Sequence, residues 1–188
     1  MVDQSIVMVS PSFAEIDGLR IRIIQSSSET GLPVLLTAPW PESIYAFNFV
    51  WEQMCGLGPI TAVDLPGFGQ SESRVDLMSP EAMGDFLVKV LDQLGIHRAH
   101  VVAPDIGTLA VLFAASRTPE RFESIIGGSG GISLGLLGDP LRQIVESTRG
   151  DFAGSEGGEQ VYQLVKGMAR TTIPECATTI IVAGLCQL

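Results

Sequence analysis

One acidic residue interrupts an apolar stretch of the chain where a carboxylate could act on a substrate. In HVVAPDIGTLAVLFAA, residues 100–115, Asp105 stands between a run typical of a buried strand and a run typical of a buried helix. A sharp strand-to-helix turn needs small neighbours, which Ala103, Gly107 and, less well, Thr108 supply. Such a turn would place the carboxylate at a helix start, where backbone N–H groups and the helix dipole favour an anion. An ionised carboxylate held there can act as a nucleophile toward carbon.

The alternative for Asp105 is a purely structural role. Aspartate is one of the favoured N-cap residues, and caps are far commoner than nucleophiles. Taken by itself, the position therefore favours a cap. The preference changes to a nucleophile only when the motifs on either side of Asp105 are considered with it.

The sequence around Asp105 alternates strand and helix patterns. Three nearly continuous apolar runs indicate strands that are covered on both faces, and an Asp-Gly pair between two alternating runs predicts a hairpin. Together these patterns predict an α/β fold with a mostly parallel sheet and helices on both faces. The expected strands are VLLTA (34–38), ITAVD (60–64), HVVAP (100–104) and ESIIGG (123–128), the hairpin is FAEIDGLRIRIIQSS (13–27), and the expected helices span 43–56, 79–96 and 106–122.

The expected helix at 79–96 has the clearest start signal in the chain. Ser79 is a suitable N-cap, and Pro80 occupies the first helical position. The helical spacing places four apolar side chains on one face, which predicts a helix packed on the sheet. These side chains are Phe86, Val90, Leu91 and Leu94.

Three segments, in the right order along the chain, resemble the α/β-hydrolases in the branch of epoxide hydrolases and haloalkane dehalogenases. AVDLPGFGQSES (62–73) is similar to that family's DLPGFGxS segment. LLTAPWP (35–41) stands where the family has its His-Gly-aromatic-Pro oxyanion loop, and VVAPDIGTLA (101–110) stands at its nucleophile elbow. The resemblance covers about residues 13–133 and implies the α/β-hydrolase fold. It also implies that 1–133 is the N-terminal part of the core and that 134–188 is a partial helical cap or a cap-to-core segment.

The resemblance implies a two-step hydrolysis with Asp105 as the nucleophile. Asp105 would attack a carbon of a small apolar epoxide, halide or ester and form a covalent alkyl ester. Water activated by a histidine, itself oriented by a second acid, would then hydrolyse this ester. The backbone N–H groups of Trp40 and Ile106 would hold the oxyanion formed in the second step. The implied partner is a small-molecule substrate.

The chain departs from the family pattern near the expected site. Ala38 and Pro39 replace the His-Gly pair, and the proline removes one backbone donor. Ile106 follows the nucleophile where dehalogenases of this branch carry a halide-binding tryptophan. Trp40 is either a substitute contact for halide or substrate, or an aromatic side chain that packs the loop onto the core.

The histidines form the largest departure. Only His97 and His100 occur, and both precede Asp105. The strand from 100 to 105 would span roughly 16 Å, so neither histidine is expected to reach Asp105 and both are interpreted as structural or surface residues. The chain therefore resembles the first portion of a longer hydrolase that lacks the last strands, the catalytic histidine and the acid. The alternative is a non-catalytic α/β-hydrolase-like protein that binds a ligand or serves as a scaffold.

Two features of the C-terminal part stay open at this point. TTIIVAG, residues 178–184, is either a core strand after a very small cap or part of the cap, although its β-branched content favours a strand. Some epoxide hydrolases use cap phenols to protonate the epoxide oxygen, and Tyr162 is the candidate here. Surface packing explains a lone tyrosine equally well.

Composition limits the classes of partner. The 188 residues carry a formal net charge of −10, which disfavours nucleic acid and anionic membranes as partners. The N-terminus lacks a signal-peptide pattern, and no apolar run approaches the roughly 18 residues of a membrane span. Cys55, Cys176 and Cys186 are widely spaced, which predicts free buried thiols and a cytoplasmic protein without a cysteine metal site.

Neither a cofactor nor a paired sheet edge is expected. GGSGG at 127–131 does not match GxGxxG and is expected to be a flexible loop after a strand, so no dinucleotide cofactor is predicted. If the last strands are missing, ESIIGG would be an apolar edge without a partner. Such an edge predicts self-association of the chain.

Overall fold

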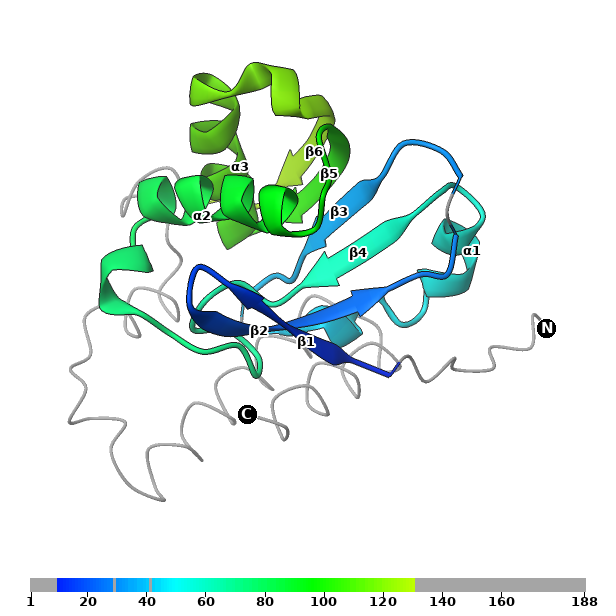
Figure 1. Cartoon of the computed structure of the whole chain (residues 1–188), viewed down its shortest axis with the longest axis horizontal. Helices are drawn as coiled ribbons and strands as arrows, with labels where there is room; N and C mark the ends of the chain where they lie inside the picture. The colour runs from blue at the N-terminus through cyan, green and yellow to red at the C-terminus, as the bar shows by residue number, and fades with distance from the viewer. Residues whose placement is uncertain (1–9, 29, 41, 131–188) are drawn as a thin grey trace. The chain divides into compact units, whose positions relative to one another are not determined.

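A six-stranded sheet forms the centre of the part of the chain described by the computed structural model, residues 10–28, 30–40 and 42–130 (Figure 1). The chain divides into two compact units, residues 1–130 and 131–188, and all described residues belong to the first. The strand order is β1-β2-β4-β3-β5-β6. The strands are β1 Ser12–Ile16, β2 Leu19–Gln25, β3 Val34–Thr37, β4 Ile60–Val63, β5 Ala99–Pro104 and β6 Phe122–Gly128.

Parallel pairing dominates the sheet, as the sequence predicts. β4, β3, β5 and β6 are parallel neighbours, whereas β1 and β2 form an antiparallel hairpin that joins the sheet through β4. Asp17 and Gly18 form the two-residue turn of this hairpin, with φ angles of 53° and 75°. The predicted hairpin and the predicted α/β class are both confirmed.

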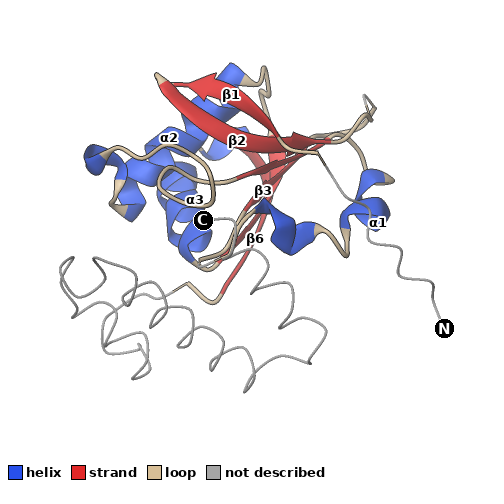
Figure 2. Ribbon diagram, turned by 90° about the horizontal axis from the view of Figure 1, so that it is seen from below, coloured by secondary structure: helices blue, strands red, loops and turns tan. Residues whose placement is uncertain are grey.

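Helices cover both faces of the sheet, and each face has its own apolar core (Figure 2). On one face, α2 (Pro80–Gln93) and α3 (Ile106–Arg117) pack side by side. On the other face, the 3₁₀ turn η1 (Ile44–Phe47) and α1 (Trp51–Cys55) contribute Ile44 and Trp51 to a smaller core. Two further 3₁₀ turns are η2 (Val75–Leu77) and η3 (Pro119–Arg121).

The start of α2 agrees with the sequence prediction. The Ser79 hydroxyl accepts a hydrogen bond from the Ala82 N–H at 3.1 Å, and Pro80 occupies the first turn. Phe86, Val90 and Leu91 are fully buried, and Leu94, just past the end of the helix, is partly buried against the same core. The apolar face therefore anchors α2 next to α3.

Three predicted elements differ from the structure, and one is the helix expected at 106–122, which ends at Arg117 and is followed by η3 and β6. The single helix expected at 43–56 is instead the two short pieces η1 and α1, because Asn48 and the aromatic and β-branched residues Phe49 and Val50 are weak helix formers. The GGSGG segment is not wholly a loop, since residues 127–128 pair with β5 as the end of β6. The boundary expected at 133/134 lies outside the described residues.

β6 is the outermost strand among the described residues. Most of its side chains are exposed, and Ile126 is 64% exposed. Self-association through this strand remains a prediction. None of the described helices has the length and apolar character needed to cross a membrane.

Candidate active site

Asp105 forms the corner between β5 and α3. Its backbone has φ 52° and ψ −121°, a conformation that side-chain-bearing residues rarely adopt. The corner is fixed from both sides, because the Asp105 N–H donates to the Gly128 carbonyl at 2.8 Å and the Asp105 carbonyl accepts from the Thr108 N–H at 3.0 Å. The predicted sharp strand-to-helix turn is therefore present at this residue.

The Asp105 carboxylate accepts hydrogen bonds from two backbone amides. The Trp40 N–H donates to Oδ2 at 2.8 Å from the loop after β3, and the Ile106 N–H also bonds to the carboxylate. Beyond the Ile106 N–H, the side chain makes no N-cap hydrogen bond to the first turn of α3, so the cap interpretation does not describe this geometry. A carboxylate can accept about four hydrogen bonds, so capacity remains for a further partner.

The pKa of Asp105 lies above its ordinary value. Burial, which disfavours the charged form, is the largest cause, and the hydrogen bonds from Trp40 and Ile106 act in the opposite direction. Among the described residues, no cationic side chain forms an ion pair with Asp105. The carboxylate is thus held by fixed dipoles rather than neutralised by an ion pair.

Small residues at the corner allow α3 to approach β3 closely. A Cβ atom added at Gly107 would overlap the Thr37 hydroxyl oxygen and would lie 3.3 Å from the Cβ of Ala103. Both Ala103 and Thr37 are fully buried. The physical reason expected from the sequence for small side chains at 103 and 107 is therefore confirmed.

Thr108 is accommodated by glycines from the end of β6. Its hydroxyl lies 2.7 Å from the Ala103 carbonyl and accepts a hydrogen bond from the Gly128 N–H at 3.0 Å. A Cβ atom at Gly127 or Gly130 would lie only 2.9 or 2.8 Å from a Thr108 carbon. Two glycines of the GGSGG segment therefore make room for the larger residue at 108 and fasten the corner to β6.

A buried ion pair supports the loop that carries Trp40. Asp64, directly after β4, accepts hydrogen bonds from Arg22 Nε at 2.5 Å, from the Ile44 N–H at 2.8 Å and from the Gln70 N–H at 3.4 Å. Arg22 and Asp64 are 1% and 0% exposed. Burial raises the pKa of Asp64, and the Arg22 guanidinium is the largest opposing cause. This pair links β2, the loop after β3 and the loop after β4.

Sequence analysis missed both this ion pair and Glu42. The Glu42 N–H donates to the Pro39 carbonyl at 2.9 Å and closes a turn around Trp40. The pKa of the partly buried Glu42 carboxyl is raised by burial first and by the negative charge of Asp105 second. The only signals in the sequence were Asp64 at the start of DLPGFG and an acid two residues after Trp40.

The structure places neither histidine beside Asp105. His100 is the second residue of β5, and its Nδ1 lies 2.7 Å from the Ser124 hydroxyl on β6. His97 precedes β5, and its backbone carbonyl accepts a hydrogen bond from Arg121 Nε at 2.8 Å. The His100 contact agrees with the structural role expected of it, whereas the contact of His97 involves its main chain alone.

Of the remaining residues singled out from the sequence, the structure describes Trp40 and Cys55. Trp40 is partly buried, and among the described residues it is not one of the side chains packed on either core. Cys55 is a partly buried free cysteine whose pKa is raised by burial. Tyr162, Cys176, Cys186 and the segments 134–188 and 178–184 lie outside the described residues.

Comparison with known proteins identifies the family of the chain. Residues 59–156, just over half of the chain, match the α/β-hydrolase fold family. Epoxide hydrolase B of Mycobacterium tuberculosis is 32% identical over 134 residues, which cover 66% of this chain and 37% of that protein. The dihydrolipoyllysine-residue acetyltransferase component of the acetoin cleaving system of Cupriavidus necator is 30% identical over 115 residues, 60% of this chain and 30% of that protein.

A solved structure shows the same fold. The haloalkane dehalogenase DatA from Agrobacterium tumefaciens C58 superposes with a TM-score of 0.64 at 21% identity, covering 94% of this chain and 67% of that one. The chain spans about a third of the length of the curated relatives it matches. It belongs to the α/β-hydrolase fold family, in the branch that contains the epoxide hydrolases and haloalkane dehalogenases.

Proposed function

We propose that Asp105 is the nucleophile of a hydrolase that forms a covalent alkyl ester with a small apolar epoxide, alkyl halide or ester. The observation that carries the proposal is the strained corner, at which two amides from separate segments, Trp40 and Ile106, converge on one carboxylate. A residue kept in such a conformation without a capping bond is expected to have a role other than starting a helix. The relatives among epoxide hydrolases and dehalogenases support the same chemistry.

In the first step, a carboxylate oxygen of Asp105 forms a bond to a substrate carbon. The bond from that carbon to its leaving group breaks, and the electron pair departs with a halide ion, with the carboxylate of an ester substrate, or with the epoxide oxygen, which takes a proton from water. The product is an alkyl ester of Asp105. The N–H groups of Trp40 and Ile106 orient the carboxylate for this attack, because they bond to it without neutralising its charge.

In the second step, water adds to the ester carbonyl carbon, and the bond to the alkyl oxygen breaks to release an alcohol. The same two N–H groups are placed to stabilise the oxyanion that forms on the carbonyl oxygen of Asp105. A base must remove a proton from this water, and neither histidine contacts Asp105: His100 Nδ1 lies against the Ser124 hydroxyl, and His97 precedes β5, whereas Asp105 follows its other end. We therefore expect the ester to persist on the 188-residue chain.

Intact-mass measurement tests the proposal directly. Incubation of the chain with 1-bromobutane is expected to add one butyl group, and peptide mapping is expected to locate it at Asp105. Asp105→Asn removes the charge with little change of shape and should abolish the adduct, whereas Asp92→Asn, an exposed acid on α2, should leave it unchanged. An adduct that survives in Asp105→Asn would contradict the assignment.

A non-catalytic ligand-binding protein is the second candidate. The observation that favours it is the absence, within the described ranges, of any imidazole in contact with Asp105. This candidate predicts that bromoalkanes and epoxides bind without adding mass to the chain. The mass experiment therefore distinguishes the two functions.

A further inference from the structure

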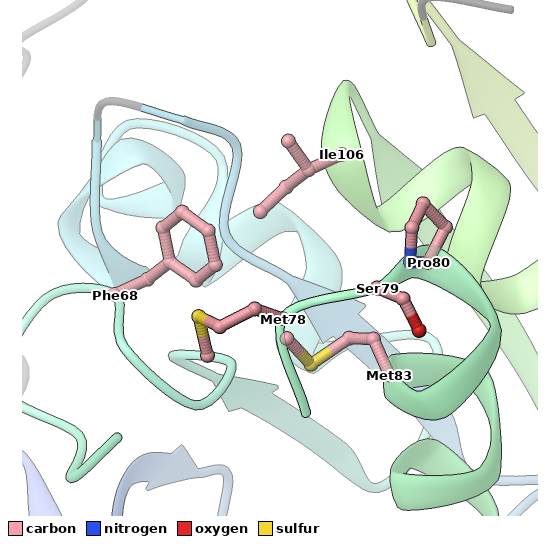
Figure 3. A pocket seen from close by; sticks show the side chains of 6 residues that line it. All are labelled: Phe68, Met78, Ser79, Pro80, Met83 and Ile106. Carbon is pink, nitrogen blue, oxygen red and sulfur yellow. The ribbon is translucent and has the colours of Figure 1, made fainter. Parts of the chain in front are cut away.

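A small apolar cavity adjoins the corner that carries Asp105. Its volume is about 110 Å³. Figure 3 shows that side chains from three separate segments surround it. The lining residues are Phe68, Met78, Ser79, Pro80, Met83 and Ile106.

The chemistry of the lining suits an uncharged apolar group. Among the described residues, no charged side chain lines it, and the lining is formed mainly by an aromatic ring, two thioethers and aliphatic carbon. The one hydroxyl, that of Ser79, already accepts the capping hydrogen bond from Ala82. A charged occupant would lose its hydration here, and the described lining offers no side chain of opposite charge.

The position of the cavity relates it to the proposed reaction. Ile106 contributes its side chain to the cavity wall, and its N–H bonds to the Asp105 carboxylate. The wall and the reacting group are therefore consecutive residues of one corner. Phe68 comes from the loop that follows Asp64, and Met78 and Met83 come from the residues around the start of α2.

The two methionines differ in how much of their side chains is buried. Met83 is 6% exposed and belongs to the main core, so its position is set by packing. Met78 is 50% exposed, and its methyl group lies against Gly67, where an added Cβ would be 3.3 Å away. A thioether side chain is flexible and adapts to irregular shapes. The Met78 wall can therefore be altered without disturbing the core.

We propose that this cavity binds the alkyl chain of the substrate and limits its length. The proposal rests on the proposed function, because it assigns the group attached to the carbon that Asp105 attacks. An apolar cavity of about 150 Å³ holds benzene, so a slightly smaller one fits an unbranched chain of about four carbons. Each methylene transferred from water into the cavity increases binding about fourfold, until the cavity is full.

The first test measures how fast bromoalkanes of increasing length, from bromoethane to 1-bromohexane, add to Asp105. The rate is expected to rise about fourfold per methylene to about four carbons and to fall for longer chains. Met78→Ala should extend the optimum by one or two carbons. Met78→Phe should shorten it, and Met54→Ala, on the opposite face of the sheet, should have no effect.

The second test measures binding without reaction. In Asp105→Asn protein, 1-bromobutane is expected to raise the unfolding temperature, and the additional change Met78→Phe should remove this increase. Binding that depends on Met78, with no adduct in the unaltered chain, would support the cavity and overturn the proposed function. If the rate of adduct formation at Asp105 depends neither on chain length nor on any Met78 substitution, the cavity proposal is overturned and the proposed function is retained.

Discussion

Asp64 and Asp105 occupy equivalent places in the fold but have opposite surroundings. Each directly follows a parallel strand, β4 or β5, and both strands pair with β3. Asp64 is completely buried and is bound by the Arg22 guanidinium and two backbone amides. Asp105 is partly exposed, is bound by two backbone amides and has no cationic partner among the described residues. The difference indicates that a carboxylate at a strand end becomes structural when a cation neutralises it and stays available for chemistry when only amides orient it.

The largest expected effect follows from removing the charge of Asp64. Asp64→Asn would leave Arg22 buried without its counter-ion, which costs about 3–5 kcal/mol of unfolding free energy. Urea unfolding of the purified chain measures this change. The exposed pair of Arg98 and Glu123 provides the matched control, since Glu123→Gln should cost less than about 1 kcal/mol. A loss at Asp64 no greater than at Glu123 would contradict the structural role.

Gly69→Ala breaks the same ion pair without altering either charge. The added Cβ would overlap the Asp64 carboxylate and would lie 2.7 Å from Arg22 Nη2. We expect the free energy of unfolding, measured in urea, to fall by about 2–4 kcal/mol. The buried charges must separate, and alanine is also strained at φ 55°. Gly95→Ala at φ 67° meets nothing within 4 Å, so it should cost only about 1–2 kcal/mol. Equal losses at the two glycines would mean that strain alone explains the effect.

Asp105→Asn is expected to change the free energy of unfolding in the opposite direction from Asp64→Asn. Because burial raises the pKa of Asp105, the folded state favours the protonated form, and its contribution to stability is lost as pH rises through the folded pKa. Asparagine carries no charge, so the variant should be more stable by about 0.5–1 kcal/mol at pH 7 and nearly unchanged at pH 4. Urea midpoints at the two pH values check this. A variant that is less stable at pH 7 would place Asp105 with the structural acids.

The smallest expected effect concerns Glu42. Burial and the charge of Asp105 raise the pKa of this carboxyl, so its ionisation lowers stability as pH rises above its ordinary value of about 4.3. Glu42→Gln should therefore stabilise the chain by less than about 1 kcal/mol at pH 7 and should have no effect at pH 3. Thermal unfolding across this range measures the difference, with the exposed Glu120→Gln as control. In an Asp105→Asn background the stabilisation should shrink, since one cause of the raised pKa is gone.

Local patterns in the sequence predicted the corner and most of the fold. The apolar runs, the Asp-Gly turn and the Ser79-Pro80 start depend on near neighbours, and each was found where the sequence placed it. The prediction of one helix at 43–56 was wrong because it relied on the apolar spacing and gave too little weight to the weak helix propensity of residues 48–50.

The supporting contacts could not be predicted because they depend on the register of distant segments. Arg22 meets Asp64 across 42 positions only because β2 pairs with β4 rather than with β3. In the same way, the fit of Thr108 against Gly127 requires β6 to lie next to β5. Residue types alone carried no sign of either contact.

The hydrogen bonds between the Asp105 corner and the end of β6 couple the movements of the two segments. The Asp105 N–H donates a hydrogen bond to the carbonyl of Gly128, the last residue of that strand, and the Thr108 hydroxyl accepts one from the Gly128 N–H. A displacement of Gly128 would therefore reach the corner at Asp105 directly through these two hydrogen bonds, in addition to the pairing of β6 with β5. The end of the outermost described strand and the Asp105 backbone are therefore expected to move together.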